Sequence, residues 1–142
     1  MPKNTEFTDK LRSSGLRPTK QRLKICEVLF NKDHTFHFTI NDLAKNISDQ
    51  LNEKISLATV YNTVHAFKKK GYLKEISINS DKSYFDTNIT NHHHFFDEDT
   101  NELIDCDVNA IDSINVKNNI TGKKINSVEV LIKVASDTQN QN

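Results

Sequence analysis

The sequence predicts an α+β protein with a helical N-terminal half and a strand-rich C-terminal half. Between residues 19 and 71, apolar side chains recur every three or four positions, and from residue 75 they alternate with polar ones. The charge also changes sign along the chain. Residues 1–85 contain 15 basic and 9 acidic side chains, whereas residues 86–142 contain 4 and 10. A basic module suits a polyanion and an acidic module suits cations, although solvated surfaces that differ by chance give the same division.

Three helices are predicted in the N-terminal half. The first covers residues 19–30, with Pro18 just ahead of its first turn. The second begins with Thr39 as its N-cap, and the third begins after Ser56 and ends at Gly71. The apolar stripe of the third helix consists of Leu57, Val60, Val64 and Phe67.

The third helix has an outer face typical of DNA recognition. This face consists of Ala58, Tyr61, Asn62, His65, Lys68 and Lys69. Tyr61 can contact thymine methyl groups, Asn62 can pair with a base edge, and the lysines can hold phosphates. Two helices joined by a tight turn, of which the second carries the readout, form a helix-turn-helix. The alternative is an ordinary helical pair with a polar exterior.

A β-hairpin is predicted behind the third helix. Residues 75–85 alternate in polarity around a polar turn at residues 79–82. A hairpin in this place is the wing of a winged-helix domain. Its tip residue Lys82, together with Arg17 and Lys20 near the first helix, is a candidate for contacts with phosphates or the minor groove.

Half of the six histidines are consecutive. Their β-branched and aromatic neighbours favour a strand over residues 89–96, in which His92 and His94 share a face and His93 points the other way. A polar turn and a returning strand make Asp105 a neighbour of the first two. Imidazole and carboxylate together are the ligand set expected for divalent iron, manganese or zinc. An exposed polar run is the alternative, because a histidine-rich tract is a compositional hint only.

The remaining C-terminal sequence predicts a helix over residues 108–120 and an alternating strand over residues 125–135. A small sheet with one helix is too small to be stable alone, so we expect dimerisation through this half. A reader of two DNA half-sites also needs two-fold symmetry. The two domains are expected to cover residues 1–87 and 88–142.

The length of 142 residues suits one medium domain or two small ones with modest cores. No segment approaches the roughly 20 apolar residues of a membrane span, and residues 1–10 do not form a signal peptide. We therefore expect a soluble cytoplasmic protein with no membrane partner. The two cysteines, Cys26 and Cys106, cannot form a disulfide framework and are expected to be small buried hydrophobes.

Four segments, taken in order and at their spacing, resemble the ferric uptake regulator family. They are residues 15–22 (GLRPTKQR), 55–64 (ISLATVYNTV), 84–86 (YFD) and 92–95 (HHHF). The resemblance covers nearly the whole chain. It implies an N-terminal winged helix, a C-terminal dimerisation domain, and a regulatory divalent metal (Fe²⁺, Mn²⁺ or Zn²⁺) that sets the angle of the two DNA-binding arms. The ligands that it implies are His37, Asp86, His92, His94 and Asp105.

The chain departs from most of that family in its cysteines. Most relatives hold a structural zinc with two Cys-x-x-Cys pairs, but Asp97 and Thr100 occupy the positions of the first pair and no second pair exists. A four-thiolate zinc is therefore impossible. This absence and the triple histidine resemble the iron response regulator branch, which is described as sensing iron through haem. In that branch the histidine cluster is linked with haem, which makes His92, His93 and His94 haem candidates.

We therefore predict a homodimeric, iron- or haem-responsive transcription regulator, a repressor or activator of iron homeostasis genes, that binds double-stranded operator DNA and is not an enzyme. Its predicted DNA contacts are Arg17, Lys20, Ala58, Thr59, Tyr61, Asn62, Lys68 and Lys82. A peroxide or manganese sensor of the same family is one alternative, because three histidines and two aspartates also resemble the peroxide regulator's ligand set. A small histidine-rich metalloenzyme or metal store is another, but such a protein would have no use for a basic recognition helix.

Overall fold

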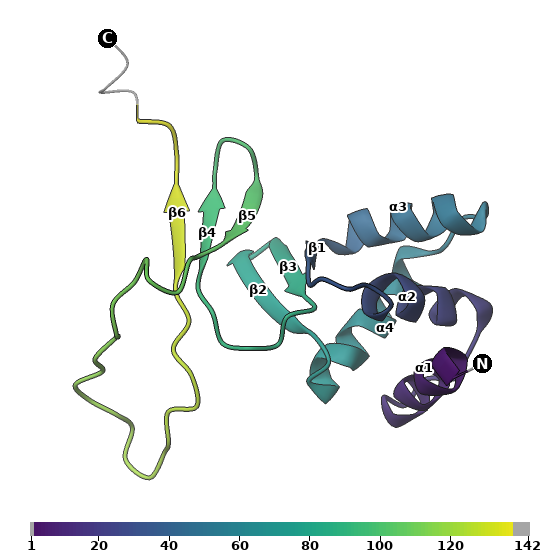
Figure 1. Cartoon of the computed structure of the whole chain (residues 1–142), viewed down its shortest axis with the longest axis horizontal. Helices are drawn as coiled ribbons and strands as arrows, with labels where there is room; N and C mark the ends of the chain where they lie inside the picture. The colour runs from purple at the N-terminus through teal and green to yellow at the C-terminus, as the bar shows by residue number, and fades with distance from the viewer. Residues whose placement is uncertain (1, 138–142) are drawn as a thin grey trace. The chain divides into compact units, whose positions relative to one another are not determined.

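The computed structural model describes residues 2–137 and divides the chain into an N-terminal unit, residues 1–89, and a C-terminal unit, residues 90–142 (Figure 1). The division falls two residues after the predicted domain boundary at residue 87. Within the described chain, every helix is too short or too polar to cross a lipid bilayer.

The N-terminal unit is a helix-turn-helix with a wing. Its described elements are α1 (Pro2–Ser13), α2 (Lys20–Phe30), β1 (His37–Phe38), α3 (Ile40–Leu51), α4 (Leu57–Lys70), β2 (Lys74–Asn79) and β3 (Lys82–Asp86). The strands form an antiparallel sheet in the order β1-β3-β2. The helix-turn-helix is therefore α3–α4, and the predicted hairpin is β2–β3.

Side-chain caps set the starts of three helices: the caps Thr39 and Ser56 were predicted, whereas Thr19, predicted as the first helical residue, is the N-cap of α2. Thr19, Thr39 and Ser56 each accept a hydrogen bond from the backbone N–H three residues further on, at 3.2, 3.1 and 3.1 Å. The helix α4 ends at Gly71, where φ is +86°, a left-handed conformation that costs glycine little. The predicted starts of the second and third of these helices and the end of α4 are confirmed.

The core of this unit lies between the helices and the sheet. Val60, Val64 and Phe67 of the predicted α4 stripe are fully buried, but Leu57 is 53% exposed, so its place in the stripe was wrong. Leu57 is the first helical residue, and Ile55, which precedes the Ser56 cap, is buried in its stead. Ile55 and Val60 flank the cap within one core cluster, as in a hydrophobic staple.

The helix α1 was not predicted, although its sequence carries a helical signal. Phe7 and Leu11, one helical turn apart, are both buried in the same core as α2. Between them in sequence, the Lys10 ammonium lies 4.4 Å from the ring centroid of Phe30 and 4.0 Å from that of Tyr72. These apolar and cation–π contacts hold α1 against the body of the unit.

The C-terminal unit is a three-stranded sheet in the order β5-β4-β6 among its described residues. Its strands are β4 (His94–Asp97), β5 (Glu102–Asp105) and β6 (Leu131–Val134), with β5 antiparallel and β6 parallel to β4. The histidine strand begins at His94 rather than at residue 89, because β5 ends at Asp105, the residue paired with His94. The predicted turn and returning strand after β4 are confirmed.

The helix expected over residues 108–120 does not form, and that prediction was wrong. Residues 106–130 contain only turns and irregular structure. Short polar side chains take the backbone hydrogen bonds there: Asp107 accepts from the N–H of Asn109, and Asn119 bonds the N–H of Ile120 and the carbonyl of Lys123. Such bonds compete with helix. The strand expected over residues 125–135 shrinks to four residues, since β4 offers four partners.

Removing the cap of the recognition helix should weaken the N-terminal unit. We expect Ser56→Ala to lower the free energy of unfolding by about 1 kcal/mol, the usual worth of an N-cap side chain. Urea denaturation followed by circular dichroism measures this. Ser80→Ala, in the exposed hairpin turn, is the matched control and should change stability by less than about 0.5 kcal/mol. Equal effects of the two substitutions would contradict the capping role.

Candidate functional site

Three potential ligands converge in the C-terminal unit: His92, His94 and Asp105, here called the triad. The Nε2 atoms of His92 and His94 each lie 3.3 Å from Asp105 Oδ1, and the two imidazole rings are 4.3 Å apart between centroids. His94 stands directly across from Asp105 in the β4–β5 ladder. The His94 side chain is buried, whereas Asp105 is half exposed. Solvent therefore reaches the triad from the side of the carboxylate.

The hydrogen bond of His92 determines which ring nitrogen faces the carboxylate. Its Nδ1 lies 2.8 Å from the carbonyl oxygen of Thr90. Because a carbonyl only accepts, Nδ1 must carry the proton, and in the neutral ring the Nε2 lone pair then points at Asp105. A lone pair and a carboxylate oxygen 3.3 Å apart repel each other unless a cation lies between them. The triad thus requires either a second proton on the ring or a bound metal ion.

The spacing of the triad fits a divalent metal. Nitrogen and oxygen ligands lie about 2.0–2.2 Å from such an ion, which places two ligands about 3.0–3.5 Å apart at tetrahedral or octahedral angles. The observed 3.3 Å separations fall in this range, and all three ligand atoms lie within 4.8 Å of one another. An Nδ1–H bonded to a backbone carbonyl is also the usual outer-sphere contact of a metal-bound histidine.

A second pair of potential ligands, His37 and Asp86, lies in the N-terminal unit. They are direct partners in the β1–β3 ladder, and His37 Nε2 is 3.5 Å from Asp86 Oδ2. Asp86 is 1% exposed, and its Oδ1 accepts the N–H of Asn88 at 2.8 Å. A carboxylate buried this deeply needs a positive partner, which either a protonated His37 or a metal ion supplies.

His93 has a different environment from its two neighbours. Its Nδ1 accepts the N–H of Val130 at 2.9 Å, and its carbonyl accepts the N–H of Cys106, also at 2.9 Å. The lone pair of Nδ1 is therefore committed, and in the neutral ring the proton is on Nε2. If Nε2 bound iron, the proton of the neutral ring would have to move to Nδ1. A protonated Nδ1 cannot accept a hydrogen bond, so the bond from the Val130 N–H would be lost. His93 ties β6 to β4, which argues against its predicted role as a haem ligand.

The predicted base-reading residues lie on the exposed side of α4. Ala58 and Asn62 are exposed, and Tyr61 is 52% exposed. Thr59 is half-buried, and its hydroxyl lies 2.9 Å from the Ser56 hydroxyl at the helix cap. The structure thus presents three of these side chains to a partner and gives Thr59 a capping contact.

The predicted phosphate-binding cations differ in their surroundings. The Lys68 ammonium lies 2.5 Å from Glu75 on β2, and this hydrogen bond is the main cause that lowers the pKa of Glu75. The Lys68–Glu75 ion pair therefore connects α4 to strand β2 of the wing. The Lys20 side chain is 72% exposed, and its Nζ forms a long ion pair with Glu53 Oε1 at 3.9 Å. The Lys82 ammonium lies over the Tyr84 ring, 5.4 Å from its centroid. Arg17 is exposed.

A model of the ferric uptake regulator family matches residues 13–134. The chain belongs to this family. A "Peroxide operon regulator" of Bacillus subtilis is 30% identical over 121 residues, which are 84% of this chain and 81% of that protein. The "Peroxide-responsive repressor PerR" of Staphylococcus aureus strain Mu50 is 36% identical over 95 residues, or 67% of this chain and 62% of that protein.

Solved structures show the same fold. The ferric uptake regulator of Vibrio cholerae matches with a TM-score of 0.65 at 24% identity, over 91% of this chain and 98% of that one. That of Pseudomonas aeruginosa with manganese matches with a TM-score of 0.62 at 22% identity, over 97% of this chain and 100% of that one. The predicted α+β fold class, an N-terminal winged helix followed by a small C-terminal domain, is confirmed, although the described residues of that domain form strands and no helix.

Membership of the ferric uptake regulator family establishes what class of protein this chain is. Proteins of the ferric uptake regulator (Fur) family are transcription regulators rather than enzymes; they bind divalent metals at histidine and aspartate sites and bind DNA operators as dimers. The chain is therefore a metal-responsive DNA-binding regulator. The predicted family and the absence of enzymatic function are confirmed.

In this Fur-family chain, hydrogen bonds of two aspartates, Asp97 and Asp99, hold the turn after β4 and the residues after β6. In the turn after β4, Asp97 Oδ1 accepts the N–H groups of Asp99 and Thr100. The Asp99 carboxylate in turn accepts the backbone N–H and the hydroxyl of Ser136, at 2.6 and 2.5 Å, and these bonds lower the pKa of Asp99. Hydrogen bonds therefore link the β4–β5 turn to the residues that follow β6.

The Cys26 thiol should be inert in the folded protein. Burial in α2 raises its pKa to about 12, against the smaller opposing effect of the Lys10 charge, so the thiol stays protonated until the pH approaches that value. In a Cys106→Ala protein, alkylation of Cys26 by iodoacetamide should be slow at pH 8 and should not level off near pH 9. The same protein unfolded in urea is the control and should react fast. A plateau near pH 9 in the native state would contradict the burial effect.

Proposed function

We propose that this Fur-family chain is a metal-responsive repressor in which the His37–Asp86 pair and the triad hold one divalent ion, Fe²⁺, Mn²⁺ or Zn²⁺. The observation that carries the proposal is the contact between His92 Nδ1 and the Thr90 carbonyl, because this contact leaves the Nε2 lone pair of the neutral ring facing Asp105, where a cation would stabilise both groups. The pair offers two ligand atoms and the triad three. Together they complete a five-ligand set of imidazole and carboxylate, which suits borderline divalent metals.

The two groups of ligands suggest how a metal would change DNA binding. The pair belongs to the unit that carries the recognition helix, and the triad to the unit with the β4–β5–β6 sheet. An ion shared by both would restrict the chain at residues 87–91 and so favour one arrangement of the DNA-binding arms. The metal can shift the equilibrium between different arrangements of the arms only if it binds one arrangement more tightly than the others.

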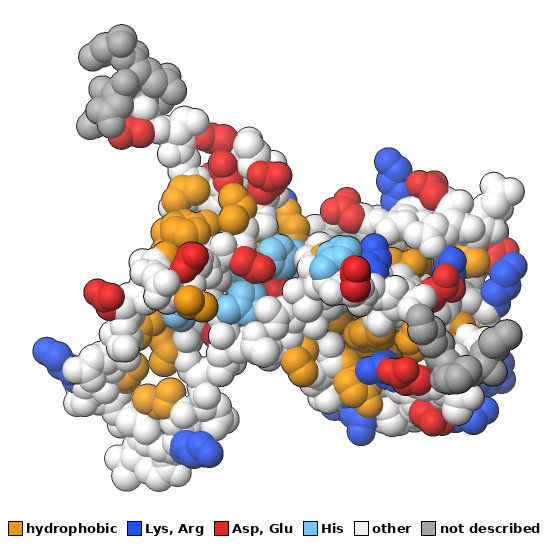
Figure 2. Space-filling view, in the orientation of Figure 1, with side chains coloured by type: hydrophobic (Ala, Val, Ile, Leu, Met, Phe, Trp, Pro, Cys, Tyr) orange, Lys and Arg blue, Asp and Glu red, His pale blue; other side chains and the backbone are white. Residues whose placement is uncertain are grey.

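The C-terminal unit would supply the dimer contact. Several of its apolar side chains are exposed, including Ile104 at 44%, Val108 at 87% and Ile120 at 73%. Figure 2 shows hydrophobic side chains gathered at the surface of this unit. A second copy of the chain would bury them, and a two-fold dimer would present two recognition helices to a pseudo-palindromic operator. In each copy Tyr61 and Asn62 would contact bases, and Arg17, Lys20 and Lys82 would contact phosphates.

The signal that best fits this chain is peroxide. Two relatives, at 30% and 36% identity, carry peroxide in their names, and the ligand set of three histidines and two aspartates resembles that of the peroxide regulators. A bound ferrous ion would activate hydrogen peroxide, and the two electrons that reduce the peroxide would come from an imidazole C–H bond. One oxygen atom of hydrogen peroxide would insert into an imidazole C–H bond and the other would leave as water. The oxidised ring, having lost its basic nitrogen, would bind metal poorly.

An iron- or haem-responsive regulator is the second candidate. It is supported by the triple histidine and by a cavity of about 400 Å³ in the C-terminal unit, lined by His92, His93 and Cys106 together with apolar side chains such as Ile111 and Val128. The Val130 hydrogen bond of His93 counts against it.

Loss of a triad histidine should abolish tight metal binding. We expect His94→Ala to weaken Zn²⁺ binding in calorimetry by more than the about 10- to 100-fold that loss of an outer-sphere partner costs. It should also remove the effect of metal on operator affinity. His34→Ala, an exposed histidine in the loop after α2, is the matched control and should behave like the wild type. Undiminished Zn²⁺ affinity in His94→Ala would rule out the triad as a ligand group.

Oxidation should distinguish the two signals. After Fe²⁺-loaded protein meets hydrogen peroxide, mass spectrometry should find one added oxygen atom on the peptides that contain His37 or His92. The Mn²⁺-loaded protein and the peptide with His65 serve as controls and should stay unmodified. No added oxygen, together with a Soret band when haem is added, would instead support the haem-responsive candidate.

A further inference from the structure

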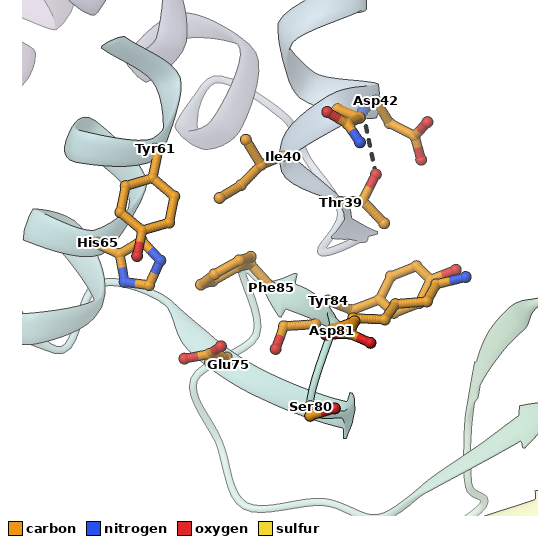
Figure 3. A pocket seen from close by; sticks show the side chains of 13 residues that line it. Thr39, Ile40, Asp42, Tyr61, His65, Glu75, Ser80, Asp81, Tyr84 and Phe85 are labelled. Carbon is orange, nitrogen blue, oxygen red and sulfur yellow. Dashed lines mark hydrogen bonds between the residues drawn. The ribbon is translucent and has the colours of Figure 1, made fainter. Parts of the chain in front are cut away.

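A third histidine of the N-terminal unit, His65, packs against the proposed base-reading tyrosine. His65 and Tyr61 are four residues apart on α4, so they lie on the same helix face. Their ring centroids are 4.1 Å apart with an interplanar angle of 37°. The imidazole thus supports one side of a tyrosine ring that is otherwise half exposed. Figure 3 shows both side chains projecting from α4 towards the wing.

On its other side, His65 contacts the wing. Its ring meets Phe85 of β3 edge-on, with centroids 5.5 Å apart. Phe85 is 2% exposed and stacks on Phe38 of β1 at 5.8 Å. A shift of β3 that moves Phe85 therefore changes the surface against which His65 rests.

The strands β1 and β3 carry the His37–Asp86 pair next to these rings. His37 pairs with Asp86, and Phe38 pairs with Phe85, in consecutive rungs of one ladder. Because successive side chains of a strand point to opposite faces, one rung presents ligands on one face and the next presents rings on the other. Any change in the spacing of the His37–Asp86 rung acts on the Phe38–Phe85 rung beside it.

The Tyr61 side chain also has space into which to move. A cavity of about 650 Å³ lies between α4, the start of α3 and the wing, and Tyr61, His65 and Phe85 are among the residues that line it (Figure 3). Displacing His65 would let the tyrosine ring turn into this cavity and away from a DNA groove. The orientation of Tyr61 therefore depends on His65 rather than on close packing all round.

We propose that His65 is a positioning residue that transmits the state of the His37–Asp86 pair through Phe85 to Tyr61. A metal ion at that pair would thus tune the base-reading side chain inside the N-terminal unit, in addition to any effect on the arms. The inference rests on the proposed function, because it takes Tyr61 as a base contact and the pair as metal ligands.

Double-mutant measurements on the full-length protein test the first link. The probe is a duplex selected from a randomised library by the Mn²⁺-loaded wild type, compared with an unselected duplex. His65→Ala should weaken binding to the selected duplex about three- to tenfold, the equilibrium equivalent of one aromatic ring pair, and leave the unselected duplex unaffected. His65→Phe, which keeps a ring, should restore the affinity. Tyr61→Ala/His65→Ala should bind no more weakly than Tyr61→Ala.

The controls separate positioning from general damage. Lys69→Ala, on the same helix, should weaken both duplexes alike, because a phosphate contact carries no sequence information. Additive losses in the double variant, or failure of His65→Phe to rescue binding, would overturn the role of His65. A wild type that does not discriminate between the two duplexes would overturn the proposed function itself.

The second link is tested by the spectrum of Tyr61. In a Tyr72→Phe/Tyr84→Phe background, Tyr61 is the only one of the three tyrosines left, so its ring resonances are directly assigned. Saturation with diamagnetic Zn²⁺ should shift these resonances. Adding His65→Ala should remove the shift while calorimetry still finds Zn²⁺ bound.

Two outcomes would contradict this second link. Bound Zn²⁺ without a Tyr61 shift, or a shift that persists in His65→Ala, overturns the coupling but leaves the metal site standing. Absence of Zn²⁺ binding overturns the coupling and the proposed function together.

Discussion

The register of β1 against β3 is the constraint on which the N-terminal unit depends. It places His37 opposite Asp86 and Phe38 opposite Phe85, so that potential ligands and core rings occupy neighbouring rungs. A slip of one residue would exchange the faces of Asp86 and Phe85, which would place the carboxylate against the apolar core and remove Phe85 from that core, and both changes cost free energy. Three hydrogen bonds between Phe36 and Thr87, one between backbone groups and two through the Thr87 hydroxyl, hold this register at the end of the ladder. A very short strand pair thereby fixes the geometry of the proposed ligand pair, His37 and Asp86, and of the Phe85 ring against which His65 of α4 packs.

The C-terminal unit also holds potential ligands in place through short strands, but it buries fewer apolar side chains than the N-terminal unit. His94 of β4 and His92 just before it both face Asp105, and His93 and Asp99 connect β6 and the residues around it through hydrogen bonds to Val130 and Ser136. The surface of the unit remains rich in exposed apolar side chains, which is understandable if a second copy of the chain covers them. Stability of this half is then linked to dimerisation, and dimerisation to the spacing of the DNA-binding arms.

A single electrostatic requirement connects these units in the proposed mechanism. The lone pair of His92 and the carboxylate of Asp105 face each other, and the buried carboxylate of Asp86 faces His37. Both arrangements need positive charge. A proton on each imidazole satisfies them separately, whereas one divalent ion satisfies them jointly and creates a connection that protons do not provide. The difference between these two ways of neutralising the same groups is what would make the protein a switch.

Local sequence determined the helix-turn-helix and the choice of ligand types. Thr39, Ser56 and Gly71 specify helix ends through bonds within four residues, and the alternation around residue 93 separates His92 and His94 from His93 wherever the strand begins. The tertiary structure alone decided which polar groups were already engaged. Lys68 meets Glu75 on another element, and His93 meets Val130 thirty-seven residues away, contacts that no local pattern around either residue predicts. The helix expected over residues 108–120 does not form, because periodicity stabilises a helix only when its apolar face is buried, and among the described residues Val108 and Ile120 stay 87% and 73% exposed.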